Sequence, residues 1–349
     1  MYFIHLDSIR FYAVSMVMFA HIFQIWTWHP ETKAVLPLGQ TGVIIFFVLS
    51  GFLITRLLLK ESDKASKFVS IKEFYIRRTL RIFPIYYLFL IVMYSFDIGG
   101  ITGHGVSLWL YLTNFYIFNQ NEWIGSYSHL WTLAIEEQFY LIWPFTVLYL
   151  KSHPKRLLTL FITVIVLAIG TRFYLLTHDF SVLQTKVFSL TSFDFFAIGA
   201  LMALVSLDNH KRLKEFGYPL MLLGFVFYYG TYYLTNEIIF IAIGQFFIGV
   251  AAAGLICNAI NAESKHNFLH NDLTVHLGKI SYGIYLYHNV IVAYYAEIMA
   301  YLGIAVGDSI IIKILCCILL TVGISELSFR IIEKPILRFK TKFRSVKAV

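Results

Sequence analysis

Residues 6–28 read LDSIRFYAVSMVMFAHIFQIWTW, an apolar run with one arginine near its start, Arg10, and one histidine near its middle, His21. A run of this length can cross the hydrocarbon core of a bilayer as a helix. Eleven residues of helix make three full turns plus about 20°, so the two side chains face the same way, about 16 Å apart. A basic group inside a membrane span is costly and usually faces a partner or a cavity, which makes His21 a candidate functional residue. The alternative is a histidine capped by a neighbouring helix.

The composition of the whole chain is that of a membrane protein. Of its 349 residues 58% are hydrophobic and 14% are charged, and the mean hydropathy is +0.71. No stretch has the mixed polar composition of a separate soluble domain. The sequence therefore predicts an all-α polytopic integral membrane protein with a single domain over 1–349, ending in a short basic tail from about 331. Cys257, Cys316 and Cys317 fall in apolar runs, so we expect core residues and neither a disulfide nor a metal site.

Apolar runs long enough to form transmembrane helices occur about ten times. They cover residues 9–28, 42–59, 82–97, 129–150, 157–177, 187–206, 217–234, 238–260, 280–302 and 309–330. Ten spans place both termini on one side, and the first run is too long for a cleavable signal peptide. We therefore expect an uncleaved first span.

The loops show a strong asymmetry of positive charge. The connections 60–81, 151–156, 207–215 and 261–279, together with the tail, hold 22 Lys and Arg residues, whereas the other set holds only Lys33 and Lys186. Cytoplasmic loops carry such an excess, so both termini are predicted to be cytoplasmic. The net charge of +8 thus reflects membrane topology, and we expect no nucleic-acid partner.

Three arginines stand close together before the third span, in FYIRRTLRIFPIYY at 74–87. Arg77, Arg78 and Arg81 fall within about one helical turn, and we expect them at the amino end of that span. A helix amino terminus favours anions, and guanidinium groups bind phosphates well, so this cluster predicts a polyphosphate site. An ordinary positive-inside anchor is the alternative.

Two adjacent carboxylates, Glu136 and Glu137, lie inside the apolar sequence SHLWTLAIEEQFYLIWP at 128–144. Counting helical rise places them about 11 Å below the outer boundary of a 30 Å core, which is the depth predicted for His21. Neighbouring helical residues point about 100° apart, so we expect one carboxylate to orient His21 as a general base and the other to face a cavity. A purely structural role for both is the alternative.

Further polar residues in the predicted spans are candidates for substrate binding. The ninth span carries SYGIYLYHN at 281–289, in which aromatic packing is the alternative for the tyrosines. Arg172 in the fifth span and Asp194 in the sixth could form an ion pair with each other or contact the substrate. The segment 98–128 has no lysine or arginine, and we expect it to lie at the interface or to re-enter the bilayer. The candidate substrate-binding residues are His129, Arg172, Asp194, Tyr282, Tyr285 and His288.

Several of these stretches together resemble one family, the acyltransferase 3 membrane acyltransferases that O-acylate bacterial surface glycans. The resemblance runs in order across nearly the whole chain. The matching pieces are Arg10 with His21, FFVLSGFLI at 46–54, RRTLRIFPIYY at 77–87, SHLWTLAIEEQFYLIWP at 128–144, FDFFAIGAL at 193–201 and SYGIYLYHN at 281–289.

The resemblance implies ten spans, an acyl-CoA donor taken from the cytoplasm and an acceptor hydroxyl on the far side. It also implies functional roles for Arg10, His21, the Arg77 and Arg81 pair, and the Glu136 and Glu137 pair. Some members carry an additional esterase-like domain after the spans. We expect that such a partner of this chain would be a separate protein.

The predicted activity is transfer of acetyl from cytoplasmic acetyl-CoA to a hydroxyl of a surface glycan, such as O-antigen, lipopolysaccharide or exopolysaccharide, in the bacterial inner membrane. No permanently bound cofactor is expected. The expected partners are acyl-CoA, a free or lipid-linked glycan and the bilayer. The sequence does not decide between a monomer and a homo-oligomer. His21 would activate the acceptor directly or form an acyl-histidine. The alternatives are another acyl group such as succinyl, a polyspecific secondary transporter, or a structural membrane protein.

Overall fold

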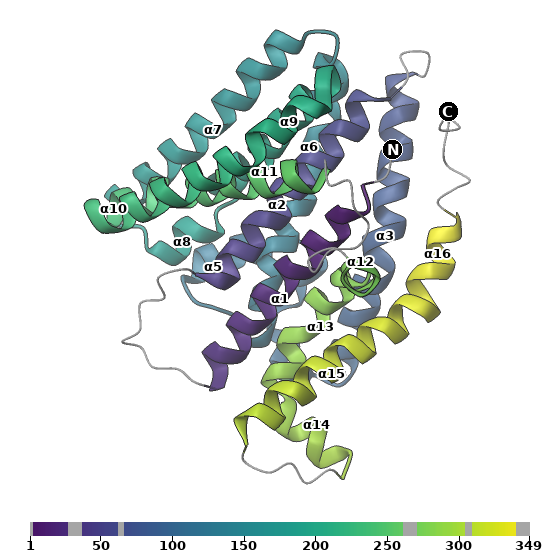
Figure 1. Ribbon diagram of the computed structural model, residues 1–349. Helices are drawn as coiled ribbons and strands as arrows, with labels where there is room; N and C mark the ends of the chain where they lie inside the picture. The colour runs from purple at the N-terminus through teal and green to yellow at the C-terminus, as the bar shows by residue number, and fades with distance from the viewer. Residues whose placement is uncertain (1–2, 27–36, 62–65, 261–270, 304–308, 340–349) are drawn as a thin grey trace.

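The computed structural model describes residues 3–26, 37–61, 66–260, 271–303 and 309–339. These residues form helices and connecting turns without a strand, which confirms the all-α prediction (Figure 1). The first half comprises α1 (His5–Trp26), α2 (Leu38–Leu59), α3 (Lys67–Ser95), η1 (Ile98–His104), α4 (Gly105–Trp109), α5 (Thr113–Gln120), η2 (Gly125–Leu130), α6 (Trp131–Leu150) and α7 (Pro154–Thr177). The second half comprises α8 (Val182–Val187), η3 (Ser189–Ser192), α9 (Phe193–Leu234), α10 (Glu237–Ile239), η4 (Phe240–Gly244), α11 (Gln245–Ile260), α12 (Asp272–Lys279), α13 (Ser281–Ala293), α14 (Tyr295–Tyr301), α15 (Ile310–Ser328), η5 (Phe329–Glu333) and α16 (Lys334–Phe339).

The chain is a multi-pass membrane protein. Among the described residues, six helices are long and apolar enough to cross a bilayer: His5–Phe23, Leu38–Leu59, Pro154–Thr177, Ser189–Ser206, Glu237–Ile260 and Ile310–Arg338. A seventh would be α3 taken with Ile98–Trp109, which bends away from it by 104°. Such a bend fits a broken span or a re-entrant segment. The predicted number of ten spans stays a prediction, because α6 carries two glutamates and α13 is short.

The arginine-bearing helix begins earlier than expected. We placed the third span at 82–97, but α3 already starts at Lys67. Arg77 is therefore ten residues, or about 15 Å, inside the helix. The free amide groups of a helix amino terminus are too far away to contribute to anion binding there, so that part of the prediction is wrong. The predicted tail is also partly helical, since α16 continues to Phe339.

Helix α9 reverses its direction, although it is helical from Phe193 to Leu234. Gly249 of α11 packs against Ile198, while Gly224 packs against Ala251, only two residues further along α11. A straight helix would separate Ile198 from Gly224 by about 39 Å. The two halves of α9 must therefore double back along α11, as the separate runs 187–206 and 217–234 predict. The connection at 207–215 is helical and not the loop that we expected.

Glycines allow the central helices to approach closely, as is common in membrane helix packing. A Cβ atom at Gly51 of α2 would lie 2.1 Å from the Phe196 carbonyl oxygen of α9, and one at Gly199 would lie 2.1 Å from the Val48 carbonyl oxygen. Helices α1 and α2 cross the middle of the molecule, with α7, α9 and α11 on one side and α13 and α15 on the other (Figure 1). The free cysteines Cys257 and Cys317 are buried, as expected of core residues, whereas Cys316 is half-buried.

Candidate active site

Two cavities lie one after the other along α1. The first, here called the arginine cavity, has a volume of about 100 Å³ and is lined by Arg10, Arg78, Arg81, Glu136, Glu137 and Tyr282, among others. The second, here called the histidine cavity, has a volume of about 680 Å³, and its lining includes His21, Trp123, His129, Trp131, Lys186 and Asn289. Arg10 and His21 thus line neighbouring cavities from one side of α1, as their spacing predicts.

Two side chains, Val43 of α2 and Tyr285 of α13, line both cavities and form the partition between them. The Tyr285 hydroxyl lies 2.6 Å from the Thr132 hydroxyl and donates a hydrogen bond to the His129 carbonyl oxygen at 3.0 Å. These contacts hold the tyrosine ring against the start of α6. The two cavities therefore adjoin at these side chains.

Only two of the three predicted phosphate ligands line the arginine cavity. Arg78 and Arg81 line the arginine cavity, and the Arg78 guanidinium lies over the rings of Phe74 and Tyr140. Arg77 does not line it, because its guanidinium forms an ion pair with Glu73 at 3.1 Å. One helical position turns the side chain by about 100°, which is enough to remove Arg77 from the cavity.

Arg10 joins the two cavity-lining arginines from another helix. Its guanidinium donates to the Asp7 carboxylate at 2.6 Å, one turn earlier in α1. This contact leaves part of the guanidinium donors for a ligand, because a guanidinium has five N–H groups. The arginine cavity therefore presents cations from α1 and α3 toward one space.

The two glutamates lie in the arginine cavity and do not reach the predicted histidine. Glu136 accepts a hydrogen bond from the Ser50 hydroxyl at 2.8 Å, and Ser50 also lies 3.4 Å from the Tyr140 hydroxyl. Glu137 lines the same cavity. No hydrogen bond joins either carboxylate to His21 among the described residues, so the expected carboxylate–histidine contact is not formed. Equal depth in the membrane does not require contact, because the partition separates the two groups.

The partner of His21 is His288. The His21 Nδ1 atom lies 2.9 Å from the His288 Nε2 atom, and the ring of His288 lies 5.0 Å from that of His129. His288 is fully buried, whereas His21 is half-buried and lines the histidine cavity. We expected His288 to contact substrate, but its position is behind His21. The three rings do not converge on a metal site within the described part of the chain.

Hydrogen bonding fixes the protonation pattern of this histidine pair. The His288 Nδ1 atom lies 2.6 Å from the Tyr285 carbonyl oxygen, which can only accept, so Nδ1 carries the hydrogen. In a neutral ring the Nε2 atom of His288 then holds a lone pair and accepts from His21 Nδ1. Neutral His21 consequently keeps a lone pair on its own Nε2 atom. This is the tautomer that a general base on the cavity wall requires.

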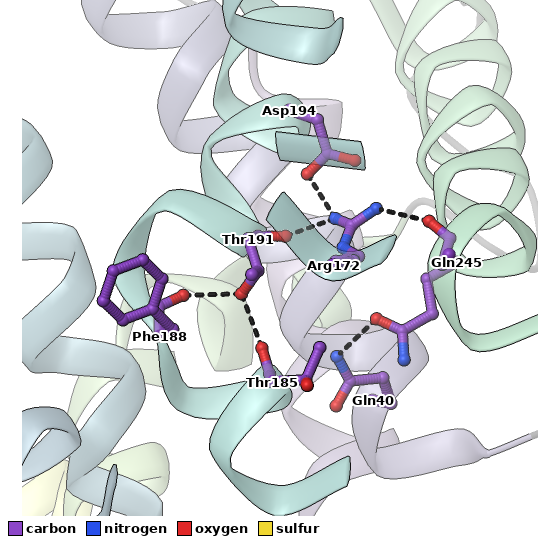
Figure 2. A network of polar contacts seen from close by, with 8 residues as sticks. Gln40, Arg172, Thr185, Phe188, Thr191, Asp194 and Gln245 are labelled. Carbon is purple, nitrogen blue, oxygen red and sulfur yellow. Dashed lines mark hydrogen bonds and ion pairs between the residues drawn. The ribbon is translucent and has the colours of Figure 1, made fainter. Parts of the chain in front are cut away.

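Two predicted substrate ligands belong to the scaffold instead. Arg172 and Asp194 form a fully buried ion pair at 2.6 Å, and the Arg172 guanidinium also donates to the Thr191 carbonyl oxygen (Figure 2). The guanidinium donates as well to the Ala242 carbonyl oxygen. Neither residue lines one of the two cavities. Their contacts tie α7 to the start of α9, and a substrate role for them is not supported. Tyr282, by contrast, lines the arginine cavity and donates to the Ile82 carbonyl oxygen at 3.3 Å.

The sequence also contains a cavity residue that we counted only for topology. Lys186, at the end of α8, lines the histidine cavity beside Trp123 and Trp131. The sequence feature that could have identified Lys186 is its rarity, because it is one of only two lysines or arginines in the outer set of loops. A charge that the topology does not need is a reason to look for a ligand.

Comparisons with known proteins identify the family of the chain. A family model described as an acyltransferase domain matches residues 3–328, which include every helix that lines the cavities. The chain is 30% identical to the peptidoglycan O-acetyltransferase OatA of Listeria monocytogenes, covering 95% of this chain and 55% of the relative. It is 29% identical to the putative peptidoglycan O-acetyltransferase YrhL of Bacillus subtilis, covering 95% and 54%, and 27% identical to the O-acetyltransferase OatA of Staphylococcus aureus, covering 95% and 56%.

The chain thus spans about half the length of these curated relatives. No solved structure matches it. The family match nevertheless runs unbroken from α1, which carries Arg10 and His21, to the end of α15. By that match the chain belongs to the acyltransferase 3 family of membrane acyltransferases.

Proposed function

We propose that this protein transfers an acyl group, acetyl in the first instance, from acyl-CoA held by the cations of the arginine cavity to a hydroxyl of a glycan in the histidine cavity. The observation that carries the proposal is the pair of cavities that share Val43 and Tyr285. One presents guanidinium groups suited to phosphates, and the other presents a histidine in its basic tautomer. The names of the relatives, O-acetyltransferases, support the same reaction.

The donor is held by charge. The phosphates of CoA rest against Arg78 and Arg81, with Arg10 further along, because charge-assisted hydrogen bonds from guanidinium to phosphate are strong. The thioester then points along α1 toward the partition. CoA stays on its own side of the membrane, and only the acyl carbon needs to approach the histidine cavity.

The chemical step uses His21 as the base. Its Nε2 atom removes the proton of the acceptor hydroxyl while the oxygen attacks the thioester carbon. The new C–O ester bond forms, the C–S bond breaks, and the proton on His21 passes to the departing CoA thiolate. His288 accepts from His21 Nδ1 throughout and keeps the ring oriented. An acyl-histidine intermediate is the second route.

The orientation of the protein follows from the loop charges. The 22 Lys and Arg residues on one side against two on the other favour a cytoplasmic opening for the arginine cavity and cytoplasmic termini. We place the protein in the cytoplasmic membrane of a bacterium, with the glycan entering the histidine cavity from the outer side. The partners are therefore acyl-CoA, a free or lipid-linked surface glycan and the bilayer.

The proposal is tested with the full chain in vesicles supplied with radiolabelled acetyl-CoA and envelope glycan from cells that lack this protein. Label should move into glycan with the wild type, and His21→Ala should reduce transfer by about 10²-fold or more, since general-base catalysis contributes that much. Acetyl-CoA binding should persist in the variant. Normal transfer by His21→Ala would remove His21 from the reaction, and export of unmodified label would favour a transporter. Succinyl-CoA in parallel would define the acyl group.

A further inference from the structure

Lys186 is a cation without a described anionic partner inside the histidine cavity. Its ammonium group lies 5.4 Å from the centre of the Trp123 ring and 5.9 Å from that of Trp131. No carboxylate within the described ranges lies at ion-pair distance from it. The two indoles stabilise the charge only in part, because a cation–π contact is weaker than a hydrogen-bonded ion pair.

The surroundings of Lys186 suit a sugar. Trp123 is 45% exposed and offers an aromatic face on the cavity wall. Trp131 is buried, and its ring lies near the Lys186 ammonium group. A cavity of about 680 Å³ is within the range of ligand pockets and has room for more than one sugar ring. His21 lies on the same cavity, so a hydroxyl bound beside Lys186 is within the space that the base serves.

We propose that Lys186 selects an acceptor sugar that carries a carboxylate close to the hydroxyl that is acylated. A single ammonium group is a point charge that matches one singly charged carboxylate, whereas doubly charged phosphate groups are better matched by arginine forks, as in the other cavity. The inference rests on the proposed acyl transfer and adds the chemical class of its acceptor.

Another use of the cation makes a different prediction. If Lys186 stabilised the oxyanion that forms on the thioester carbonyl, its loss would lower kcat equally for charged and neutral acceptors. If it binds the acceptor carboxylate, its loss raises the acceptor KM for charged acceptors and leaves neutral ones almost unchanged. The response of the two acceptor forms therefore separates the roles.

The experiment compares envelope glycan from cells that lack this protein with the same glycan after its carboxylates are converted to amides by carbodiimide and ammonia. The wild type, Lys186→Gln and Lys186→Arg are assayed with acetyl-CoA in vesicles. Amidation should reduce kcat/KM of the wild type at least about tenfold, through the acceptor KM. Lys186→Gln should treat both glycans alike, and Lys186→Arg should keep the preference because it keeps the charge.

The outcomes are distinct. Equal transfer by the wild type to both glycans, or an undiminished preference in Lys186→Gln, would overturn the role of Lys186 while leaving acyl transfer intact. No transfer by the wild type to either glycan would count against the proposed function itself, and with it this inference. An unchanged KM for acetyl-CoA in Lys186→Gln shows that the variant is folded, and a loss of preference then supports the proposal.

Discussion

The hydrogen bond between His21 and His288 decides which nitrogen of His21 can accept a proton. Because the Tyr285 carbonyl oxygen requires a hydrogen on His288 Nδ1, the donor in the histidine pair must be His21 Nδ1. In many hydrolases a carboxylate accepts a hydrogen bond from the Nδ1 atom of the base histidine and so fixes its tautomer and orientation. Here the neutral His288 ring accepts that hydrogen bond from His21. His288 is thus a positioning residue for the proposed base.

Replacing His288 tests this relation. His288→Ala should lower kcat at least about tenfold, since a hydrogen bond to a charged ring is worth about 1.5–3 kcal/mol, while the KM for acetyl-CoA stays unchanged. Glutamine offers an acceptor oxygen to His21 Nδ1, so His288→Gln should recover part of the rate. Steady-state kinetics of the three proteins provide the measurement. A wild-type kcat in His288→Ala would show that the pairing is only structural.

The arginines of α3 make a second prediction with an internal control. Replacing Arg78 and Arg81 together by Gln should weaken acetyl-CoA binding at least about tenfold, because charge-assisted contacts to phosphate are lost. Arg77→Gln should change it less than about twofold, because Arg77 is paired with Glu73 outside the cavity. Isothermal titration with acetyl-CoA gives both values. Equal losses in the two variants would mean that binding follows the general positive charge of this part of α3.

The charge of Lys186 gives a third prediction, in pH dependence. Lys186 lies in α8, before the span that starts at Ser189, and burial lowers its pKa to about 8. Its charge is therefore present below pH 8 and lost as the pH rises above it. The wild-type preference for native over amidated glycan should decline through this range. Titration of His21 as the base of the chemical step slows transfer to both acceptors alike and cancels in the ratio. A preference that is constant from pH 7 to 9.5 would contradict the assignment.

At the residue scale, the sequence predicted the types of group but not their partners. The resemblance and the cost of burial single out His21, yet His288 stands 267 residues away and nothing local chooses it over Glu136. Arg77 and Arg78 are adjacent residues of the same type. Only the rotation of α3 against its neighbours decides which of the two side chains faces the cavity. The class of chemistry was predictable because buried charge is rare; the pairing was not, because it depends on tertiary packing.

At the scale of elements, helical periodicity was a good guide where the helix is regular. The spacing of Arg10 and His21 correctly placed both on one side of α1. It was a poor guide to helix ends: α3 begins at Lys67 because polar residues continue the helix beyond its apolar part. The reversal in α9 was predicted from two apolar runs, but not that the connection between them is helical.

The glycine crossing of α2 and α9 permits a stability test. Gly199→Ala should destabilise the protein by about 1–3 kcal/mol, because the added Cβ would lie 2.1 Å from the Val48 carbonyl oxygen and the helices would have to separate. Gly230→Ala is the matched control in the same helix, since no atom lies within 4 Å of its added Cβ. Thermal unfolding in detergent should show a lower midpoint only for Gly199→Ala. Equal unfolding midpoints would show that α2 and α9 can separate at this crossing with little loss of stability.

At the scale of the whole molecule, both cavities are built from distant parts of the chain. Helices α1, α2, α3, α6 and α13 all contribute to the arginine cavity, so no single segment contains the site. The sequence predicted the membrane class and the family, because hydropathy and ordered motifs are properties of the whole chain. It did not predict two cavities with a partition, because cavity shape depends on how these helices cross.

The orientation predicts which ends of the molecule a reagent can reach. Cysteine introduced at Asn119 should react with a membrane-impermeant maleimide in intact cells, and cysteine at Phe68 should react only after lysis, because the loop charges differ by 22 to two. Both positions are exposed in the structure. The unmodified protein is the control for its three native cysteines. Labelling of position 68 in intact cells would reverse the proposed direction of transfer.

The partition formed by Val43 and Tyr285 has a consequence for the energy of the cell. A continuous aqueous path through a membrane protein would let protons run down the membrane potential, each releasing about 2.3 kcal/mol per 100 mV. Side chains packed between two separate cavities interrupt such a path, whereas an acyl group bonded first to sulfur and then to oxygen needs no water along its way. The proposed transfer would therefore run in an energised membrane without opening a path for ions.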